Sequence, residues 1–393
     1  MDTPPNIDEL TPPTRTLMGP GPTNVHPRVL RSMQTPMLGY LDPAFVELMN
    51  ETQELLRYVF QTDNAMTFPI SGTGTAAMEA AFYNLVEPDE TVLVPDNGYF
   101  GQRQGKIAKR AGGEVVTIDA PWGEPLDPDD VEAAFREHDP TVFGFVHGET
   151  STGVKQPDIP ELTSIAHEHD AYVIADTVPS LGGVEFRTDA WDLDVVYSGS
   201  QKCLSAPPGV APITVNDRAM EKVRSRETDP RSWYLDLELL EDYWGDDPSY
   251  HHTGPISLVY ALREACRLIV EEGLEARWDR HRRIANALRS GLEAMGFPVE
   301  RPEDYWLPTL NAVSVPDGVD PDAVVEYLME EHDIEIVGGL GDLAGDIWRI
   351  GCMGYSAREE NIPYLLTALG HAVETQGYDV DIGAGIDAMS QSL

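Results

Sequence analysis

The sequence predicts an α/β protein in which a large domain, built on a mainly parallel β-sheet flanked by helices, precedes a smaller C-terminal α+β domain. Three observations support this prediction. The chain has 393 residues, more than one hydrophobic core usually supports. Short apolar stretches alternate with helical stretches over its first half, as is typical of parallel sheets. The pattern then restarts after a long helical region, which indicates a second domain.

The large domain contains six short apolar runs that we expect to form strands. They are Thr91–Pro95, Glu114–Ile118, Thr141–His147, Ala171–Asp176, Val195–Ser198 and Ala211–Val215. Helices are expected between them at Thr75–Leu85, Gly101–Ala111, Pro128–Glu137 and Pro160–His169. A long amphipathic helical region then runs from Ile256 to Met295.

The C-terminal part has strands and helices of its own. The expected strands are Ala312–Val315, Ile334–Gly338 and Ile347–Ile350, and the expected helices are Pro321–Glu331 and Glu359–Glu374. We therefore divide the chain into an N-terminal arm (1–16), a large domain (17–272), a small domain (273–377) and a tail (378–393). The tail is rich in Gly, Asp and Ser, so we expect it to be flexible.

The net charge of −40 is extreme and spread along the whole chain. Such a surface repels nucleic acids and anionic membranes, so neither is expected as a partner. Abundant carboxylates with only five lysines indicate adaptation to high salt, where self-repulsion is screened. The N-terminus lacks the basic start and apolar stretch of a signal peptide, and no apolar run is long enough to span a membrane. We expect a cytoplasmic protein.

One of the five lysines, Lys202, follows the apolar strand 195–198 in a small polar turn. Ligands of open α/β sheets bind at the carboxyl ends of strands. A lysine held there loses solvent, which lowers its pKa and suits it to Schiff-base chemistry. A lysine that merely extends from a strand end into solvent is the alternative, and this segment alone does not decide between the two.

Asp176 closes another apolar strand, 26 residues before Lys202. Burying a carboxylate is costly unless it meets a cation or hydrogen-bond donors. It is either the N-cap of the next segment or the partner of a protonated pyridine nitrogen, as in a pyridoxal phosphate site.

The segment Ser71-Gly72-Thr73-Gly74-Thr75 leads directly into a helix, so its free N–H groups and the helix dipole suit a phosphate. It matches neither a dinucleotide fingerprint nor a P-loop. Phe100 follows another strand and either packs in the core or stacks on a flat ring. Arg349, in Trp348-Arg349-Ile350-Gly351, needs an anion, which is either a structural partner or a substrate carboxylate.

No metal site is expected. The pair His251-His252 has no carboxylate or cysteine at ligand spacing. Cys203, Cys266 and Cys352 also lack metal-ligand spacing and read as small buried hydrophobic residues.

Together these segments resemble the fold-type I, class V pyridoxal phosphate aminotransferases, especially the alanine–glyoxylate/serine–pyruvate group. The resemblance covers nearly the whole chain. Its motifs are Gly19-Pro20-Gly21-Pro22, Ser-Gly-x-Gly at 71–74, His147 to Gly153, Tyr197 to Lys202, Ala206-Pro207-Pro208-Gly209, Tyr-His-His-Thr at 250–253 and Arg-Ile-Gly at 349–351.

The resemblance implies a role for each matching residue. Lys202 is the Schiff-base lysine and Asp176 the partner of the pyridine nitrogen, and these two are the catalytic pair. Thr73, Gly74, Thr75 and Gln201 match the phosphate cradle, Phe100 the ring-stacking position, and Thr150 the hydroxyl at the cofactor ring. Tyr250 and Thr253 match residues that reach the phosphate of the neighbouring subunit, which implies a homodimer with shared sites. Gly21, Thr150 and Arg349 match substrate-binding positions.

Three positions depart from the close relatives. Phe100 stands where they have tryptophan, Thr75 where they have histidine, and Thr150 where they have serine. Phenylalanine still presents a π face, whereas a hydroxyl in place of an imidazole changes the hydrogen bonds around the cofactor. These changes leave the reaction class intact and the preferred amino donor open.

The implied activity is ping-pong transamination of a small amino acid, alanine or serine, with glyoxylate or pyruvate, through an aldimine to Lys202. Ureidoglycine–glyoxylate or aspartate aminotransferases of the same class are the nearest alternatives. A cysteine desulfurase is a more distant alternative, because it needs a mobile catalytic cysteine. Cys203 is too constrained next to Lys202 and Cys266 falls on an expected helix, so Cys352 is the one candidate that the sequence leaves open. A silent paralogue that only binds the cofactor is a further alternative, but it needs no substrate clamp, so the presence of Lys202, Asp176 and Arg349 together argues against it.

Overall fold

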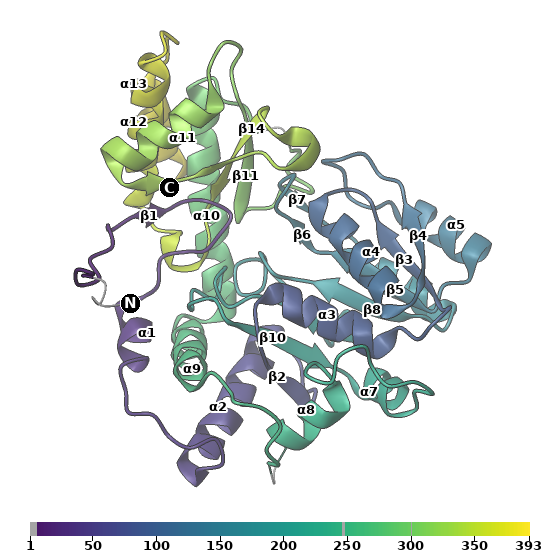
Figure 1. The fold of residues 1–393 in the computed structure, drawn as a ribbon. Helices are drawn as coiled ribbons and strands as arrows, with labels where there is room; N and C mark the ends of the chain where they lie inside the picture. Colours follow the sequence, from purple (N-terminus) through teal and green to yellow (C-terminus); the bar gives the residue numbers. More distant parts are fainter. Residues whose placement is uncertain (1–5, 246–247, 300) are drawn as a thin grey trace.

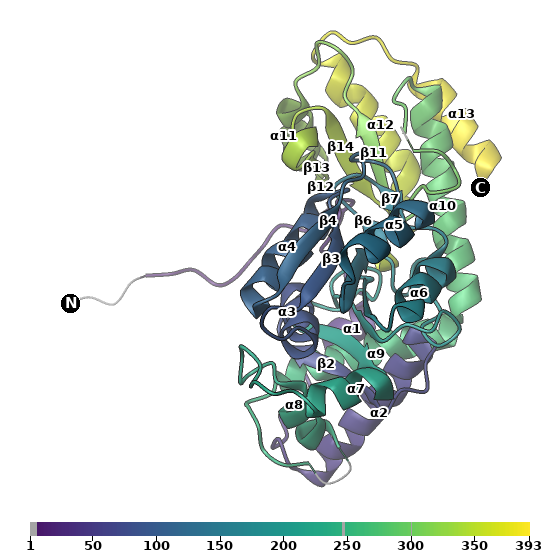
Figure 2. The same ribbon diagram turned by 90° about the vertical axis from the view of Figure 1, so that its right-hand side faces the viewer.

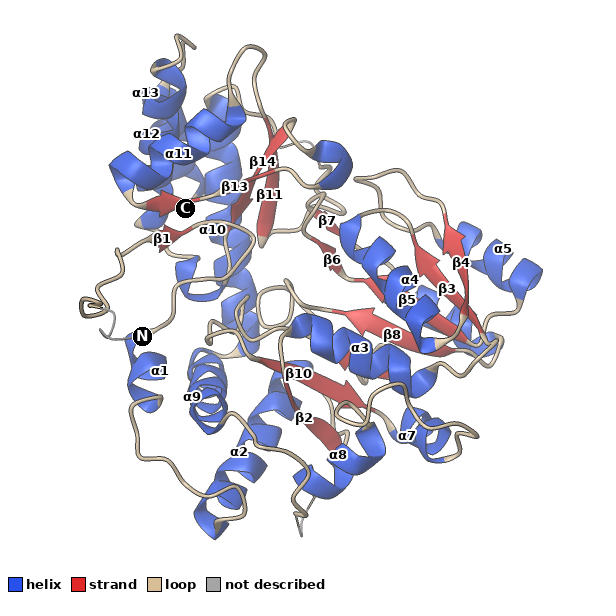
Figure 3. Ribbon diagram, in the orientation of Figure 1, coloured by secondary structure: helices blue, strands red, loops and turns tan. Residues whose placement is uncertain are grey.

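The computed structural model describes residues 6–245, 248–299 and 301–393. Its centre is a seven-stranded sheet in the order β2-β10-β9-β8-β5-β3-β4 (Figures 1 and 3). All neighbouring strands are parallel except β10, which runs antiparallel to β2 and β9. The strands are β2 Met66–Ser71, β3 Thr91–Pro95, β4 Glu114–Ile118, β5 Val142–Val146, β8 Tyr172–Asp176, β9 Val195–Tyr197 and β10 Val210–Val215. The predicted α/β fold with a mainly parallel sheet is confirmed.

Helices cover both faces of this sheet because its strands are apolar on both sides. In β3, Val92 and Val94 pack into one buried cluster while Leu93, which points to the other face, packs into another. The first face is covered by α3 Gly74–Leu85, α4 Tyr99–Ala111, α7 Asp217–Arg224 and α8 Leu237–Trp244. The second is covered by α5 Pro128–His138, α6 Ile159–Glu168 and α9 Ile256–Glu272.

Two further helices precede the sheet in sequence. They are α1 Pro27–Ser32 and α2 Pro43–Phe60, and α2 contributes side chains to both clusters. Residues 6–15 before them form neither helix nor strand, and this segment runs away from the body of the molecule (Figure 2). A short hairpin, β6 Gly148–Glu149 and β7 Val154–Lys155, follows β5.

The predicted helical region 256–295 is two helices. Gly273 has φ of +83° and separates α9 from α10, Leu274–Ala294. Glycine adopts this left-handed backbone without the cost of a Cβ clash, so the chain turns there. Our expected domain boundary at about residue 273 falls at this turn and stays a prediction.

A second sheet, which is antiparallel and has the order β11-β14-β13, lies in the C-terminal part. Its buried cluster contains residues after 283 together with Met18. The predicted strand 334–338 is two short strands, of which one pairs with β1 near the N-terminus and the other joins this sheet. The elements are β1 Thr16–Leu17, β11 Leu310–Ser314, α11 Pro321–His332, β12 Ile334–Glu335, β13 Val337–Gly338, β14 Ile347–Gly351 and α12 Asn361–Glu374.

The prediction of a flexible tail is wrong. Residues Ile382–Ser392 form helix α13, which is capped by the Asp381 carboxylate and packs against α10 (Figure 1). Gly291 of α10 and Gly385 of α13 face each other closely, since a Cβ on Gly291 would lie 3.1 Å from the Gly385 carbonyl oxygen. One of the glycines that suggested a loose tail, Gly385, is a residue that lets the two helices approach.

No helix in the described parts of the chain is long and apolar enough to cross a membrane.

Candidate active site

A cavity of about 200 Å³ lies at the carboxyl ends of the parallel strands. Phe100 follows β3, Thr150 follows β5, Asp176 ends β8 and Lys202 follows β9, so neighbouring strands deliver these side chains to one place. The cavity is lined by Thr73, Gly74, Thr75, Met78, Phe100, Arg103, Gly148, Thr150, Asp176, Val178, Pro179, Gln201 and Lys202. The structure therefore brings together the predicted catalytic pair and most of the predicted cofactor residues.

Lys202 is held by its own turn. Its carbonyl oxygen accepts hydrogen bonds from Ser205 N at 2.9 Å and Thr23 Oγ1 at 3.3 Å, and its Nζ donates to the Pro20 carbonyl. The pKa of the amine is lowered to about 8: burial is the main cause and the charge of Arg349 adds to it, whereas Cys203 and Asp176 act in the opposite direction. The amine is thus partly unprotonated near neutral pH, as a nucleophile or proton carrier must be.

Gly21 approaches this amine closely. Its φ is +103°, and a Cβ at this position would lie 2.6 Å from Lys202 Nζ. Any other residue would both strain the backbone and displace the lysine. The loop around Gly21 is consequently one wall of the space around the amine.

Asp176 is 1 % exposed, and both of its hydrogen-bond donors are neutral. Oδ1 accepts from Val178 N at 2.8 Å, and Oδ2 accepts from the Tyr197 hydroxyl at 2.9 Å. Burial raises the pKa of the carboxyl to about 7, because these two bonds offset the loss of water only in part. The site presents a carboxylate that a cationic group in the cavity would stabilise.

The N-terminus of α3 opens into the same cavity. Thr73 is its N-cap, and the Thr73 side chain makes no capping bond, so the first N–H groups of the helix remain available. The buried Gln201 Oε1 also has no hydrogen-bond partner among the described residues. The free N–H groups of the helix N-terminus suit an anion such as phosphate, whereas Gln201 Oε1 is an acceptor and needs a hydrogen-bond donor.

Glu149 fixes the N-terminus of α4, on which Phe100 stands. Its buried carboxylate accepts from Phe100 N at 2.9 Å and from the Ser151 hydroxyl at 2.7 Å. A Cβ on Gly98 would lie 2.3 Å from Glu149 Cγ, so this contact requires glycine. Burial raises the pKa of the Glu149 carboxyl, and the hydrogen bonds from Ser151, Phe100 and Gly101 oppose that shift.

Arg103 lies at the edge of the cavity. Its guanidinium stacks over the Phe100 ring at 4.8 Å, and its Nη1 donates to Thr75 Oγ1 at 3.2 Å. The hydroxyl at position 75 and the phenyl ring at position 100 are thereby linked through one arginine. These are two of the three positions at which the sequence analysis expects a departure from the family that the chain resembles.

Arg349 does not line the cavity but stands beside it. Its Nε donates to the Gly338 carbonyl at 2.8 Å and its Nη1 to the Thr150 carbonyl at 3.5 Å. Burial lowers the pKa of the guanidinium, while the charge of Glu149 raises it. An anion bound next to Lys202 would meet this charge.

Tyr250 and Thr253 lie apart from the cavity on the surface of the chain. The two hydroxyl oxygens are 3.2 Å apart, and Tyr250 is 56 % exposed. Their contact with a neighbouring subunit stays a prediction. Between them, His252 Nε2 contacts Ser71 Oγ at 2.6 Å, and the His251 ring stacks on Trp233.

The cysteines have the environment of core residues. All three are buried, and burial raises the pKa of each thiol to about 12. Within the described ranges, no group of three or more His, Cys, Asp or Glu side chains is arranged to hold a metal ion.

Sequence reasoning did not assign Glu149, Arg103 or Tyr197 to the site, although Glu149 and Tyr197 lie in motifs that it singled out. Glu149 carries the same signal as Asp176, a carboxylate in an otherwise buried stretch. Tyr197 is buried in β9 and also accepts from Gln104 Nε2 at 3.2 Å, so it reads as a core residue until its hydroxyl is placed.

Comparison with known proteins agrees with this geometry. Residues 17–343 match the family model described as Aminotransferase class-V. A curated alanine–glyoxylate aminotransferase of Drosophila melanogaster is 42% identical over 92% of this chain and 93% of its own. The crystal structure of an alanine–glyoxylate aminotransferase from Nostoc has a TM-score of 0.91 and 48% identity, covering 94% of this chain and 97% of that one. The ureidoglycine–glyoxylate aminotransferase of Bacillus subtilis has a TM-score of 0.96 and 41% identity, covering 98% and 99%. The chain belongs to the class V aminotransferases.

Proposed function

We propose that this aminotransferase transfers the amino group of a small amino acid, alanine or serine, to glyoxylate or pyruvate, with pyridoxal phosphate bound in the cavity at Lys202. The class V family depends on pyridoxal phosphate, and the chain is an aminotransferase. The observation that carries the proposal is the convergence of a buried amine of lowered pKa and a buried carboxylate of raised pKa in one cavity.

The residues present fit this cofactor. The N-terminus of α3 with Thr73, Gly74 and Thr75 would hold the phosphate, and the NH2 group of the Gln201 side chain, which lines the same cavity, would donate to it. Phe100 and Val178 offer apolar contacts for a flat ring, and Asp176 lacks the cation that a protonated pyridine nitrogen would supply. When bound, the cofactor supplies an aldehyde that accepts the amino group and a ring that takes up the electrons of a broken bond at Cα.

The side chains then have distinct tasks. Lys202 Nζ would hold the aldehyde carbon until a substrate amine replaces it, and the freed amine would move the proton from the substrate Cα. Asp176 would keep a proton on the ring nitrogen. Arg349 would bind the substrate carboxylate, and Gly21 would leave room for the substrate beside the amine.

Ureidoglycine is the second candidate donor. The Bacillus subtilis relative named for that substrate covers nearly the whole chain at a TM-score of 0.96. An aspartate aminotransferase structure from Thermus thermophilus is less similar, at 32% identity and a TM-score of 0.80. Cysteine desulfurase activity is disfavoured, since all three thiols are buried and have pKa values of about 12.

We include in this proposal the homodimer with shared sites, in which Tyr250 and Thr253 reach the partner, and the cytoplasmic location inferred from the sequence. The exposed Tyr250 ring suits such a contact. Sedimentation of the purified enzyme would give the mass of a dimer, and a monomer with full activity would contradict shared sites.

Half-reactions test the chemistry. Alanine, serine, ureidoglycine, aspartate and cysteine are added separately to the pyridoxal-phosphate-loaded enzyme, and loss of the visible band and the keto acid formed are measured. We expect alanine or serine to react fastest and glyoxylate or pyruvate to restore the band. Lys202→Ala should lose the visible band and transaminate at least about 10³-fold more slowly. A Lys202→Ala variant that works at the wild-type rate would refute the site.

A further inference from the structure

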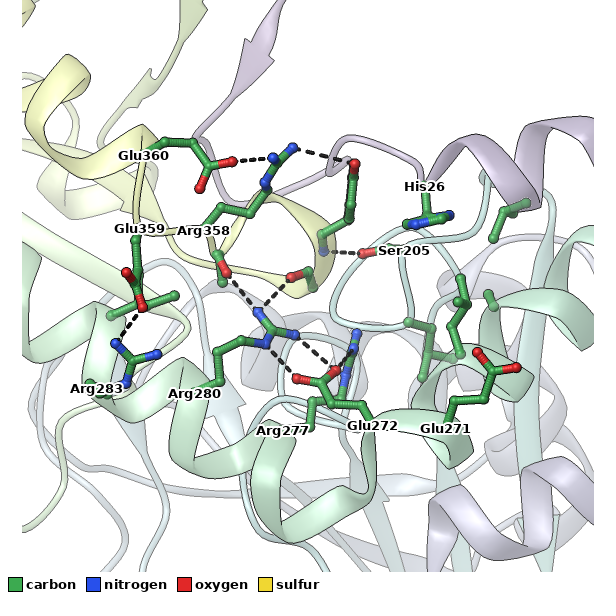
Figure 4. Close-up of a pocket in the computed structure, with 18 residues that line it drawn as sticks. His26, Ser205, Glu271, Glu272, Arg277, Arg280, Arg283, Arg358, Glu359 and Glu360 are labelled. Atoms are coloured by element: carbon green, nitrogen blue, oxygen red, sulfur yellow. Dashed lines mark hydrogen bonds and ion pairs between the residues drawn. The ribbon is translucent and has the colours of Figure 1, made fainter. Parts of the chain in front are cut away.

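A larger cavity of about 600 Å³ lies away from the candidate active site (Figure 4). It is enclosed by α1, the junction of α9 and α10, the turn after Lys202 and the turn that follows β14. Its lining is strongly charged. Three of these residues, Glu272, Arg277 and Arg280, come from the junction of α9 and α10, and Figure 4 shows their side chains meeting on that side of the cavity.

Arg277 connects the helix junction to the catalytic lysine. Its side chain is 7 % exposed, and its Nη1 pairs with Glu272 Oε2 at 2.7 Å. Its Nη2 donates to the Cys203 carbonyl at 2.6 Å and its Nε to the Gly182 carbonyl at 2.8 Å. Cys203 directly follows Lys202, so a buried guanidinium fixes the backbone from which the catalytic side chain departs.

Arg280 connects the same junction to the strand that carries Arg349. It pairs with Glu272, and its Nη1 donates to the Ala357 carbonyl at 2.6 Å and the Gly354 carbonyl at 3.3 Å. These carbonyls belong to the turn that follows β14. One carboxylate thus joins two arginines that hold two different turns.

The two turns also contact each other. Tyr355 N donates to Ser205 Oγ at 2.7 Å, across the boundary between them. His281 Nε2 accepts from Gly354 N at 2.8 Å, while its Nδ1 lies 2.8 Å from the Arg277 carbonyl. The pKa of this buried imidazole is held well below its ordinary value, by burial first and then by Arg280 and Arg277, so it stays neutral and accepts this bond.

Glu272 must be charged for this arrangement to hold. Burial alone would raise the pKa of its carboxyl, but the Arg280 hydrogen bond and the charges of Arg277 and Arg280 bring it below its ordinary value. Removing the charge would leave a buried guanidinium without its partner, which is costly. The arginines would then lose their common anchor and both turns would loosen.

We propose that Glu272, Arg277 and Arg280 are positioning residues that fix Lys202 relative to the Arg349 strand. The proposal rests on the proposed function in so far as Lys202 and Arg349 act on the same substrate. A bound amino acid is held by its carboxylate at Arg349 while its amine and Cα meet Lys202. A displacement of about 1 Å between two such groups costs on the order of 10² in rate.

The test compares Glu272→Gln with Glu271→Gln. The neighbouring Glu271 lines the same cavity and also pairs with two arginines, Arg28 and Arg267, but its side chain is 45% exposed and touches neither turn. Glu272→Gln should lower kcat/KM for the amino donor about 10- to 100-fold. Glu271→Gln should stay within about twofold of the wild type, because exposed ion pairs contribute little.

Hydrogen exchange of the cofactor-free enzyme gives the second readout. In Glu272→Gln, peptides covering 199–206 and 353–358 should exchange at least about tenfold faster, whereas peptides of β3 stay unchanged. In Glu271→Gln neither turn should change. Unaltered exchange at both turns, or faster exchange with wild-type kcat/KM, overturns the proposal.

Arg280→Lys tests the Arg280 connection to the turn after β14 separately from the Arg277 connection to the turn after Lys202. It also provides the test if Glu272→Gln does not fold. Lysine keeps a charge beside Glu272, but its single ammonium cannot replace both the nitrogens that bind Glu272 and the Nη1 that donates to the Gly354 and Ala357 carbonyls. We expect faster exchange only in 353–358, with a KM for the donor raised about tenfold and kcat changed less. Equal changes of exchange in both turns would contradict the inference that Arg277 and Arg280 hold different turns.

A wild-type enzyme that transaminates no donor would instead refute the proposed function. The exchange result would still decide whether Glu272, Arg277 and Arg280 hold the two turns.

Discussion

Two buried aspartates stand at opposite ends of neighbouring strands and have opposite electrostatic environments. Asp176 ends β8, and Asp194 directly precedes β9. They are 1 % and 0 % exposed, so burial alone would raise both pKa values. The pKa of Asp176 is raised to about 7, whereas that of Asp194 lies below its ordinary value.

Their partners explain the difference. Asp194 accepts from His167 Nε2 at 2.9 Å, from Val173 N at 2.8 Å and from Arg218 Nη1 at 3.0 Å. Among the described residues, the hydrogen-bond donors to Asp176 are a backbone N–H and a tyrosine hydroxyl, and both are neutral. At the amino end of the strands, cationic side chains of the protein balance the charge of Asp194. At the carboxyl end, a bound ligand would have to balance the charge of Asp176. A buried carboxylate with neutral partners is therefore the stronger indicator of a binding site.

The largest difference from the wild type, in both activity and stability, is expected for Asp176→Asn. Activity should fall about 10²- to 10³-fold, since the charge that would stabilise the protonated cofactor ring is lost. The cofactor-free protein should instead become more stable. A folded-state pKa raised from 3.8 to about 7 means that wild-type stability is lost as pH rises through this range. A shift of about three units corresponds to roughly 4 kcal/mol, which is the upper bound of the gain at pH 8.

Thermal unfolding of both cofactor-free proteins at pH 4 and pH 8 measures this difference. The advantage of Asp176→Asn should be small at pH 4 and largest at pH 8. A variant equally destabilised at both values would show that Asp176 already has a cationic partner.

Asp194→Asn should lower the stability of the protein and leave its activity nearly unchanged, the opposite of what we expect for Asp176→Asn. Losing an acceptor for His167 and Arg218 should cost roughly 2–3 kcal/mol of unfolding free energy, the range for hydrogen bonds to charged groups. Activity per folded molecule should stay within about twofold of the wild type, because Asp194 lies at the other end of the strands. Urea unfolding at pH 7 and kcat at 25 °C check both expectations, and a stable but inactive variant would contradict them.

A smaller, pH-dependent effect is expected at His167. The hydrogen bond that His167 donates to Asp194 raises the pKa of the imidazole, although burial opposes the shift. A raised pKa means that the stabilisation is fully present below the unfolded-state value of 6.5 and is lost as pH rises through the folded-state value. His167→Gln should therefore destabilise more at pH 5.5 than at pH 8.5. Melting temperatures at the two pH values decide this, and a larger effect at pH 8.5 would be the wrong sign.

The sequence predicts strands and helices well where their patterns are regular. The ranges of β3 and β4 agree with prediction because each is an uninterrupted run between turns. The strand β2 was not predicted because Pro69 breaks its pattern, and only the structure shows Pro69 opposite Pro212 in the antiparallel pair with β10. Helix α13 was misjudged from composition, since its stability comes from packing on α10.

The candidate site follows the same division. Lys202 and Asp176 were found because a charged residue at the end of an apolar strand is a local signal, and their shared cavity follows from the order of parallel strands. Glu272 and Arg277 carry no such signal. The partners of Arg277 at Gly182 and Cys203 lie far away along the chain, so its role depends on how α10 packs beside the turns that follow β8 and β9.

Salt should have the smallest effect on stability, and it should change the repulsion between surface carboxylates more than the interactions of the two buried aspartates. The net charge is −40, and carboxylates on the surface repel one another at low ionic strength. Raising KCl from 0.1 to 3 M should screen this repulsion and raise the melting temperature by a few degrees, about 1–2 kcal/mol for a chain of this size. The stability differences of Asp176→Asn and Asp194→Asn from the wild type should stay nearly constant, because buried interactions are screened much less. Equal fold and activity in millimolar and molar KCl would refute the adaptation to high salt that the composition predicts.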